Sequence, residues 1–211
     1  MKPSIKLMSA LLLLTALFAN PASAKEWAFN VYFGDTEIGQ HTFVLTEHEG
    51  GERELVSNAN FDIKILFAHV YSYLHTADEK WQGDCLTGLT AHTNDNGTTT
   101  AIKGKLGDDG FALEVGKTKK MLPACPMTFA YWNPVYLKQD KLLNPQTGEW
   151  LDVKIKSLGN ESIEVRGQQT PAEHYRIEGK KLKIDVWYSP DKEWLALTST
   201  VSQGVVSYRL K

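Results

Sequence analysis

Several classes of protein are excluded by what this sequence of 211 residues lacks. It has 23 Lys and Arg against 25 Asp and Glu, a net charge of -2, so it lacks the broad basic field of a nucleic-acid-binding domain. It contains no G-x-S-x-G motif, the nucleophile elbow of many hydrolases. Its histidines show no H-x-x-x-H or H-x-H spacing of the kind that zinc sites use. We therefore expect no nucleic-acid partner, no metal and no cofactor.

Long apolar runs are also missing, except at the N-terminus. Two lysines precede an apolar run over residues 7–19, and Ala22-Ser23-Ala24 then supplies the small residues of a signal-peptidase site. This pattern predicts a secretory signal peptide over residues 1–24, cleaved after Ala24, and one mature domain over residues 25–211. The run is shorter than the roughly 20 residues of a membrane-spanning helix, and no later stretch is apolar enough to span a bilayer. We expect a periplasmic or secreted protein.

Only two cysteines are present, Cys85 and Cys125. An oxidising compartment, together with an even count and no C-x-x-C spacing, favours one structural disulfide. The alternatives are a metal pair, which needs further ligands nearby, and a reactive thiol, which needs an identifiable base. We predict that the two cysteines are bonded, with their Cα atoms within about 7 Å.

The rest of the chain is dominated by apolar residues at alternate positions, the period of a half-buried β-strand. The pattern starts in residues 27–33 and returns after residue 150, in short segments separated by turn signals. Asn96-Gly97 lies between two such segments and supplies the positive φ angles of a type I′ turn. Closely spaced strands joined by tight turns indicate sequential antiparallel pairing. The predicted fold is all-β, either a single large curved antiparallel sheet or an incomplete β-barrel.

Residues 123–146 interrupt this pattern with four prolines and a dense aromatic load. A short helix with loops, packed across the sheet, is predicted there. Pro134 disfavours the helical conformation at Asn133, so we expect any helix to end at that point and Trp132 to be largely buried against the concave face of the sheet. Such a segment is either part of the core or a lid over a cavity.

Short motifs are spread along the chain: Phe33-Gly34-Asp35-Thr36-Glu37-Ile38-Gly39, Tyr71-x-Tyr73-x-His75, Trp81 before Cys85-Leu86, Trp132-Asn133 and Leu143-Asn144-Pro145-Gln146-Thr147-Gly148. Together they resemble a family of exported bacterial proteins that is known only as a domain of unknown function. The resemblance extends to other uncharacterised envelope β-proteins, whose curved sheets are similar to those of periplasmic lipoprotein carriers. It implies an architecture and a compartment, and it brings no functional residues with it.

One strand carries an unusual set of side chains. Between residues 67 and 81, the odd positions place aromatic and histidine side chains on one face. Such side chains combine apolar area with hydrogen-bonding tips, which suits a groove for an acyl chain or a sugar ring. An ordinary core or sheet surface is the alternative, because strands favour aromatic residues in any case. The candidate ligand-binding residues are Tyr71, Tyr73, His75, Trp81, His92 and Trp132.

These features support three functions. The first is non-catalytic binding of a lipid or other amphipathic small molecule between the curved sheet and residues 123–146. The second is a cell-envelope enzyme acting on a glycan or lipid, with His75, His92 and a carboxylate as acid and base, which requires at least two of them within hydrogen-bond reach. The third is a protein-interaction module that uses an exposed sheet edge.

Overall fold

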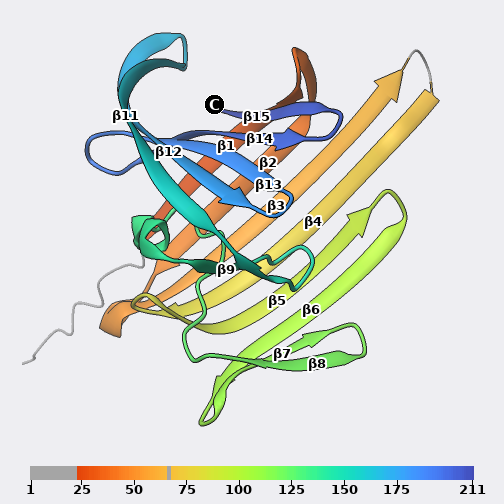
Figure 1. The fold of residues 1–211 in the computed structure, drawn as a ribbon, viewed down its shortest axis with the longest axis vertical. Coiled ribbons are helices and arrows are strands. Elements are labelled where there is room, and N and C mark those ends of the chain that lie inside the picture. The colour runs from red at the N-terminus through yellow and green to blue at the C-terminus, as the bar shows by residue number, and fades with distance from the viewer. Residues whose placement is uncertain (1–22, 66–67) are drawn as a thin grey trace, which may run out of the picture.

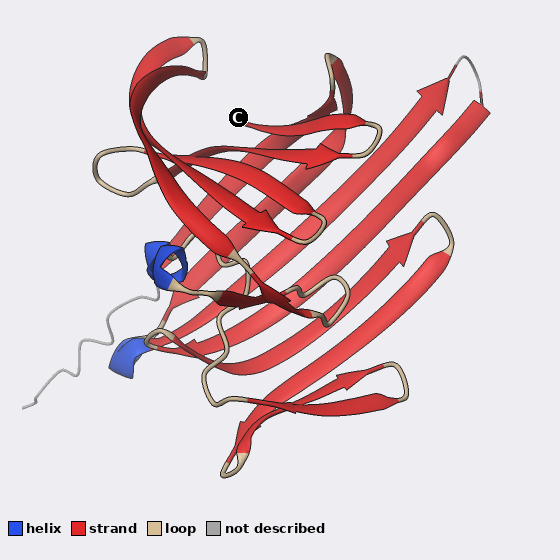
Figure 2. Ribbon diagram, viewed as in Figure 1, coloured by secondary structure: helices blue, strands red, loops and turns tan. Residues whose placement is uncertain are grey.

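The computed structural model describes residues 23–65 and 68–211, so most of the predicted signal peptide lies outside the described residues and remains a prediction. Strands dominate (Figures 1 and 2), and the described residues include two short 3-10 helices, η1 (Glu49–Gly51) and η2 (Pro134–Lys138). None of the described helices is long and apolar enough to cross a membrane. The strands are β1 (Ser23–Phe33), β2 (Thr36–Glu47), β3 (Glu52–Ile65), β4 (Ala68–Gln82), β5 (Cys85–Asp95), β6 (Thr98–Gly107), β7 (Gly110–Val115), β8 (Thr118–Leu122), β9 (Lys141–Leu143), β10 (Trp150–Asp152), β11 (Lys154–Val165), β12 (Gln168–Gly179), β13 (Leu182–Tyr188), β14 (Trp194–Val201) and β15 (Gly204–Leu210).

Thirteen strands form one antiparallel sheet in the order β11-β12-β13-β14-β15-β1-β2-β3-β4-β5-β6-β7-β8. Neighbours in the sheet are therefore neighbours in the chain, except at the centre, where β1 pairs with β15. Within the described residues, the outer strands β8 and β11 do not pair with each other, so the strongly curved sheet stays open (Figure 1). The predicted all-β fold with one large curved antiparallel sheet is confirmed.

Turn chemistry and strand period account for the regularity of this sheet. Asn96 and Gly97 both have positive φ angles, 49° and 91°, as the hairpin between β5 and β6 requires. Along β4, the side chains of Tyr73, His75 and Trp81 are buried, whereas those at the intervening positions are mostly exposed. Each long strand thus has an inner face that packs in the core and an outer face that meets solvent.

Residues 123–153 connect β8 to β11 and cover part of the inner face; we call them the crossing segment. It contains η2 and the small sheet of β9 and β10, with Tyr136, Leu142 and Leu143 fully buried in the main core. The prediction of a short helix and loops packed across the sheet is confirmed, but the two short strands were not expected. Pro134 begins η2 rather than ending a helix, since proline lacks only an N–H that the first helical turn leaves unpaired.

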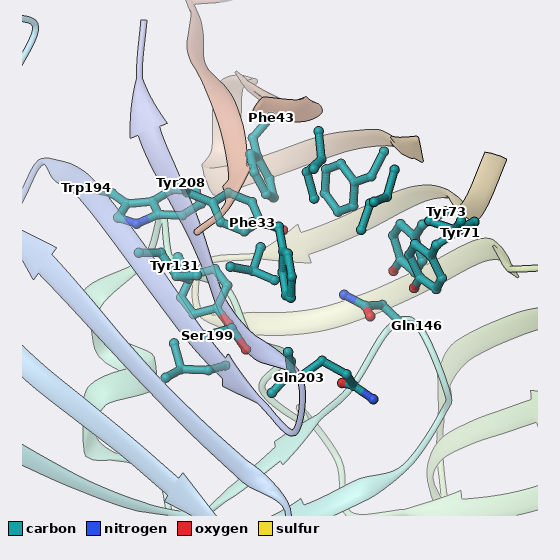
Figure 3. A pocket seen from close by; sticks show the side chains of 18 residues that line it. Phe33, Phe43, Tyr71, Tyr73, Tyr131, Gln146, Trp194, Ser199, Gln203 and Tyr208 are labelled. Atoms are coloured by element: carbon teal, nitrogen blue, oxygen red, sulfur yellow. The ribbon is translucent and has the colours of Figure 1, made fainter. Parts of the chain in front are cut away.

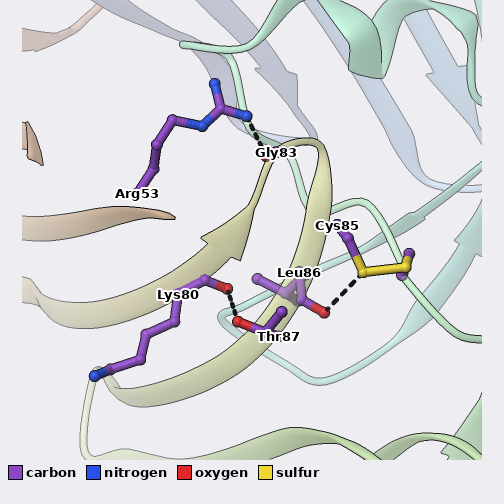
Figure 4. Close-up of a disulfide and its surroundings, with 7 residues drawn as sticks. Arg53, Lys80, Gly83, Cys85, Leu86 and Thr87 are labelled. Carbon is purple, nitrogen blue, oxygen red and sulfur yellow. Dashed lines mark hydrogen bonds between the residues drawn. A yellow bond between two sulfur atoms is a disulfide. The ribbon is translucent and has the colours of Figure 1, made fainter. Parts of the chain in front are cut away.

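The crossing segment is attached to the sheet near its start. Cys85 at the beginning of β5 is bonded to Cys125, with the Cα atoms 4.4 Å apart, which confirms the predicted disulfide (Figure 4). Trp132 is 7% exposed and meets Trp81 edge to face, with ring centroids 5.6 Å apart. The Arg53 guanidinium also lies over the Trp132 ring, 4.6 Å from its centroid. The predicted burial of Trp132 is confirmed, and here the segment is core rather than lid.

Polar contacts complete this attachment. The Asn133 side-chain amide donates to the carboxylate of Asp84 at 2.9 Å, and the same oxygen accepts from Arg53 at 3.1 Å. Arg53 also donates to the carbonyl of Gly83, next to the disulfide (Figure 4). Further along, the Tyr188 hydroxyl donates to the backbone carbonyl of Tyr131 at 2.6 Å. The segment is therefore attached both to the β4–β5 turn and to β13.

Replacing Trp132 should destabilise the protein strongly. Trp132→Ala removes a large side chain that packs between Trp81 and Arg53, so we expect a loss of about 3–5 kcal/mol in the free energy of unfolding. The measurement is a urea titration followed by circular dichroism. Trp187→Ala is the matched control, because Trp187 is half-buried on the outer face, where it stacks on His174, and it should cost much less. Equal losses for the two variants would contradict a core role for Trp132.

The disulfide should contribute comparably. It links residues 40 positions apart, and closing such a loop stabilises by roughly 3–4 kcal/mol in the chain-entropy description. Replacing both Cys85 and Cys125 by serine should therefore lower the urea midpoint by a corresponding amount. Thiol labelling of the unreduced, denatured wild-type protein should find no free cysteine. Two labelled thiols per chain would show that the bond does not form.

Candidate ligand-binding site

A cavity of about 590 Å³ lies between the inner face of the sheet and the crossing segment (Figure 3). Its volume falls within the 300–1,000 Å³ that small-molecule sites commonly occupy. Its walls come from β1 to β4, from β13 to β15, and from two positions of the crossing segment. The lining residues are Phe33, Ile38, Phe43, Phe61, Ile63, Val70, Tyr71, Tyr73, Tyr131, Gln146, Ile184, Trp194, Leu197, Ser199, Val201, Gln203, Val206 and Tyr208.

The lining is aromatic and aliphatic, and its polar groups are hydroxyls and amides. No Asp, Glu, Lys, Arg or His belongs to it among the residues that the structure describes. At the rim, Val70 and Val201 are 45% and 40% exposed, so apolar surface continues from the interior to the solvent. Exposed valines at the mouth of an apolar cavity suit a ligand whose apolar part enters from that side.

Two of the predicted residues, Tyr71 and Tyr73, lie in this lining on the inner face of β4. The ring of Tyr73 stacks on Phe61 of β3, with centroids 5.2 Å apart, and Tyr73 is only 7% exposed. Burial raises the pKa of both hydroxyls above the ordinary value, and for Tyr71 a hydrogen bond to Asp95 acts in the same direction. Both tyrosines are therefore neutral at physiological pH, as hydrogen-bonding groups rather than nucleophiles.

Gln146 reaches the cavity from the crossing segment (Figure 3). Its backbone is held on both sides, because its N–H donates to the Asn144 side chain at 2.9 Å and its carbonyl accepts from the Thr93 hydroxyl at 3.0 Å. Gly148 completes the loop with a φ of 72°, and a Cβ there would lie 2.3 Å from a methyl group of Val115. The loop of residues 144–149 therefore presents the Gln146 side chain from a fixed backbone.

His75 supports this loop from behind rather than lining the cavity. The Thr93 hydroxyl has one proton, which it donates to Gln146, so it accepts from Nδ1–H of His75 at 2.9 Å. Burial lowers the pKa of His75 to about 4, so the ring is neutral at physiological pH. His41, whose Nε2 lies 2.7 Å from the Ser57 hydroxyl, is also buried, and its pKa falls to about 3 because of that burial and the nearby His75.

The other predicted ligand-binding residues lie elsewhere. Trp81 and Trp132 are buried beside the disulfide, in the core rather than in the cavity lining. His92 is exposed on the outer face of β5, because its neighbours Ala91 and Thr93 occupy the inner face and strand positions alternate. The structure therefore places these three residues away from the cavity lining, and their part in ligand binding stays a prediction.

The structure also separates His75 and His92, the two histidines predicted to act as acid and base. His75 and His92 lie on opposite faces of the sheet, so they are not within reach of each other. In the part of the chain that the structure describes, no group of three or more His, Cys, Asp or Glu side chains is placed to hold a metal ion. The lining residues that the structure describes also include no Asp, Glu, Lys, Arg or His side chain next to the cavity.

Sequence reasoning missed most of the cavity wall. Leu197, Ser199, Val206 and Tyr208 line it from β14 and β15, which alternate clearly in the sequence but give no sign of lying beside β1. Gln146 was missed as a site residue although its motif was noted. Phe33, at the end of the first strand, also belonged to a noted motif. The signal that could have found Gln146 and Phe33 was the same: each lies in a motif next to a turn, and strand formation alone does not explain that motif.

A separate titratable group lies beneath the crossing segment. Glu79 is 4% exposed, and its carboxylate accepts from the Trp81 indole at 3.0 Å and from the Thr128 hydroxyl at 3.3 Å. Desolvation outweighs these two hydrogen bonds and raises the pKa of Glu79 from 4.5 to about 7. The folded protein therefore holds a proton on Glu79 at pH values where the unfolded chain has lost it.

The stability should depend on pH through this residue. Because the folded-state pKa is raised, the contribution of Glu79 is fully present below pH 4.5 and is lost as pH rises through about 7, by roughly 3 kcal/mol in all. Glu79→Gln keeps a neutral side chain of the same shape. The difference in unfolding free energy between variant and wild type should thus be constant below pH 4.5 and should shift in the variant's favour up to pH 8. A difference that is independent of pH would contradict the raised pKa.

The comparison between variant and wild type is needed because other groups titrate in the same range. His41 and His75 have lowered pKa values in the folded state, so their contribution is lost as pH falls from about 6.5 to 3. The wild-type profile is the sum of these opposing effects, whereas the difference isolates Glu79.

Comparisons with known proteins agree with this architecture. No curated protein matches the chain. The crystal structure of a "Beta-barrel-like Protein of Domain of Unknown Function DUF1849 from Brucella abortus" is similar, with a TM-score of 0.65 at 6% sequence identity, over 88% of this chain and 94% of that chain. At that identity the likeness shows the fold alone. The family described as Domain of unknown function (DUF6134) matches residues 29–211, and the chain belongs to that family.

Proposed function

We propose that this protein is a non-catalytic, exported binding or carrier-like protein that holds a hydrophobic or amphipathic small molecule in the cavity under the crossing segment. The observation that carries the proposal is the cavity itself. It combines about 590 Å³ of space with aromatic walls and uncharged polar groups, the usual composition of a lipid or other small-molecule site. Periplasmic or secreted localisation follows from the signal-peptide pattern of residues 1–24 and is part of the proposal.

Packing favours a preformed cavity over one that opens only with a ligand. The disulfide and the Trp81–Trp132 contact fix one end of the crossing segment, and the loop at Gln146 is held by Thr93 and Asn144. Because both ends of this wall are already held in place, little conformational entropy is lost when a ligand binds, and this favours affinity.

The two other functions have less support. The enzyme loses its proposed pair, because His75 and His92 lie on opposite faces. The interaction module needs an accessible sheet edge, but charged side chains are exposed on both outer strands, a usual protection against edge pairing. They are Lys119 and Lys120 on β8, and Lys154, Lys156, Glu161 and Glu164 on β11.

Blocking the cavity should abolish binding without unfolding the protein. Ser199 lines the cavity, so Ser199→Trp should fill it, whereas the adjacent Thr198 faces outward and Thr198→Trp is the matched control. Each protein is purified from the periplasm and studied by native mass spectrometry, and its binding of the uncharged fluorophore Nile red is titrated. We expect a co-purifying lipid and saturable Nile red binding for the wild type and the control, and a loss of at least tenfold in affinity for Ser199→Trp.

Two results would contradict the proposal. One is the absence of both a co-purifying ligand and Nile red binding in the wild type. The other is equal binding by Ser199→Trp and the wild type, which would place the binding surface outside the cavity.

A further inference from the structure

One residue of the cavity lining carries a buried polar atom without a partner among the described residues. The Tyr73 hydroxyl is buried and makes no hydrogen bond to any described residue. Leaving such a group unpaired costs roughly 1–3 kcal/mol, so buried hydroxyls are nearly always satisfied by protein, water or ligand. Three other buried atoms share this state, on Trp27, Arg53 and Trp132, but none of these residues lines the cavity.

A second donor faces the same part of the cavity. In Figure 3, the hydroxyl groups of Tyr71 and Tyr73 are directed toward the side from which the Gln146 amide enters. The Tyr71 hydroxyl donates its hydrogen bond to Asp95, so it has only lone pairs to offer a ligand. Tyr73 and Gln146 can therefore supply O–H and N–H donors to an acceptor atom of a ligand in this part of the cavity.

The charges around this point select a neutral acceptor. The described lining contains no Lys, Arg or His that could balance a buried anion, and the carboxylate of Asp95 lies beside Tyr71. Burying an unpaired carboxylate in such surroundings is strongly unfavourable. A carbonyl oxygen of an ester or amide accepts two hydrogen bonds without a net charge.

We infer that the ligand is a neutral acyl ester or acyl amide, whose carbonyl oxygen accepts hydrogen bonds from the Tyr73 hydroxyl and the Gln146 side-chain amide. Its hydrocarbon chain lies among the apolar walls formed by residues such as Phe43, Phe61 and Leu197. This inference rests on the proposed function, because it specifies the chemistry of the molecule that occupies the same cavity.

The test compares three probes of equal chain length, methyl laurate, laurate and dodecane, by displacement of Nile red at pH 8. The wild type should bind methyl laurate more tightly than the other two. Tyr73→Phe removes the donor and keeps the ring, so it should weaken methyl laurate binding about tenfold, corresponding to one hydrogen bond of about 1.4 kcal/mol, and leave dodecane unchanged. Gln146→Leu should have the same selective effect.

Tyr32→Phe is the matched control, since it removes a tyrosine hydroxyl that donates to Glu37 and lies outside the cavity lining. It should change methyl laurate affinity less than twofold. Tyr73→Phe should also fold with at least wild-type stability in urea, because it removes an unpaired buried group. A stable variant keeps the binding result interpretable.

The outcomes separate this inference from the proposed function. If the wild type binds Nile red but Tyr73→Phe affects all probes equally or none, the carbonyl assignment is overturned while ligand binding in the cavity stands. Tighter binding of laurate than of methyl laurate would overturn the requirement for a neutral ligand. If Nile red binds the wild type but none of the three probes displaces it, the inference fails and the proposed function stands. If the wild type shows neither Nile red binding nor a co-purifying ligand, the proposed function fails and the inference fails with it.

Discussion

The attachment of the crossing segment to the inner face of the sheet is the constraint on which the rest of the structure depends. An open, curved sheet of thirteen strands leaves an apolar concave face that must be covered. The disulfide at Cys125 and the indole of Trp132 hold the segment against one end of that face, where packing is complete. Elsewhere along this face the sheet is covered less closely: the segment contributes Tyr131 and Gln146 to the wall, and a cavity remains. The same segment therefore acts as core and as cavity wall.

Strand β4 shows how one face can serve both purposes. Its inner positions change character along the strand, from Trp81 and Glu79 beneath the crossing segment, through His75 behind the Gln146 loop, to Tyr73 and Tyr71 in the cavity. Polar groups are tolerated in this row because most of them have partners: Glu79 accepts two hydrogen bonds and His75 donates one. Tyr73 departs from this pattern, and its position in the cavity is the reason that a ligand explains it better than a structural role.

Much of this architecture could be predicted from local sequence, because strand period and turn chemistry are local properties. Alternation along β4 predicted the shared inner face of Tyr73, His75 and Trp81, and Asn96-Gly97 predicted the hairpin. The disulfide followed from cysteine count and expected compartment. By contrast, Pro134 was interpreted as the end of a helix although it begins one, since a proline is compatible with either side of a helix boundary.

The site was harder to predict because it depends on pairing between distant strands. Phe33 and Val206 are opposite each other in the β1–β15 ladder, yet nothing in either segment specifies its partner. His92 illustrates a second difficulty, which is to predict the face of the sheet to which a strand residue points. That face depends on the register of the strand, and a shift of one residue reverses it. The residue type suggested a role for His92. Because His92 alternates with the inward-facing Ala91 and Thr93, its side chain lies on the outer face.

The pairing of β1 with β15 also governs when the cavity can form. Phe29 pairs with Leu210, so the centre of the sheet is closed by residues from the two ends of the described chain, a contact with a high entropic cost of loop closure. The cavity has walls from both of these strands, including Phe33 from the first and Val206 and Tyr208 from the last. The cavity therefore forms only when strands from both ends of the described chain are in place.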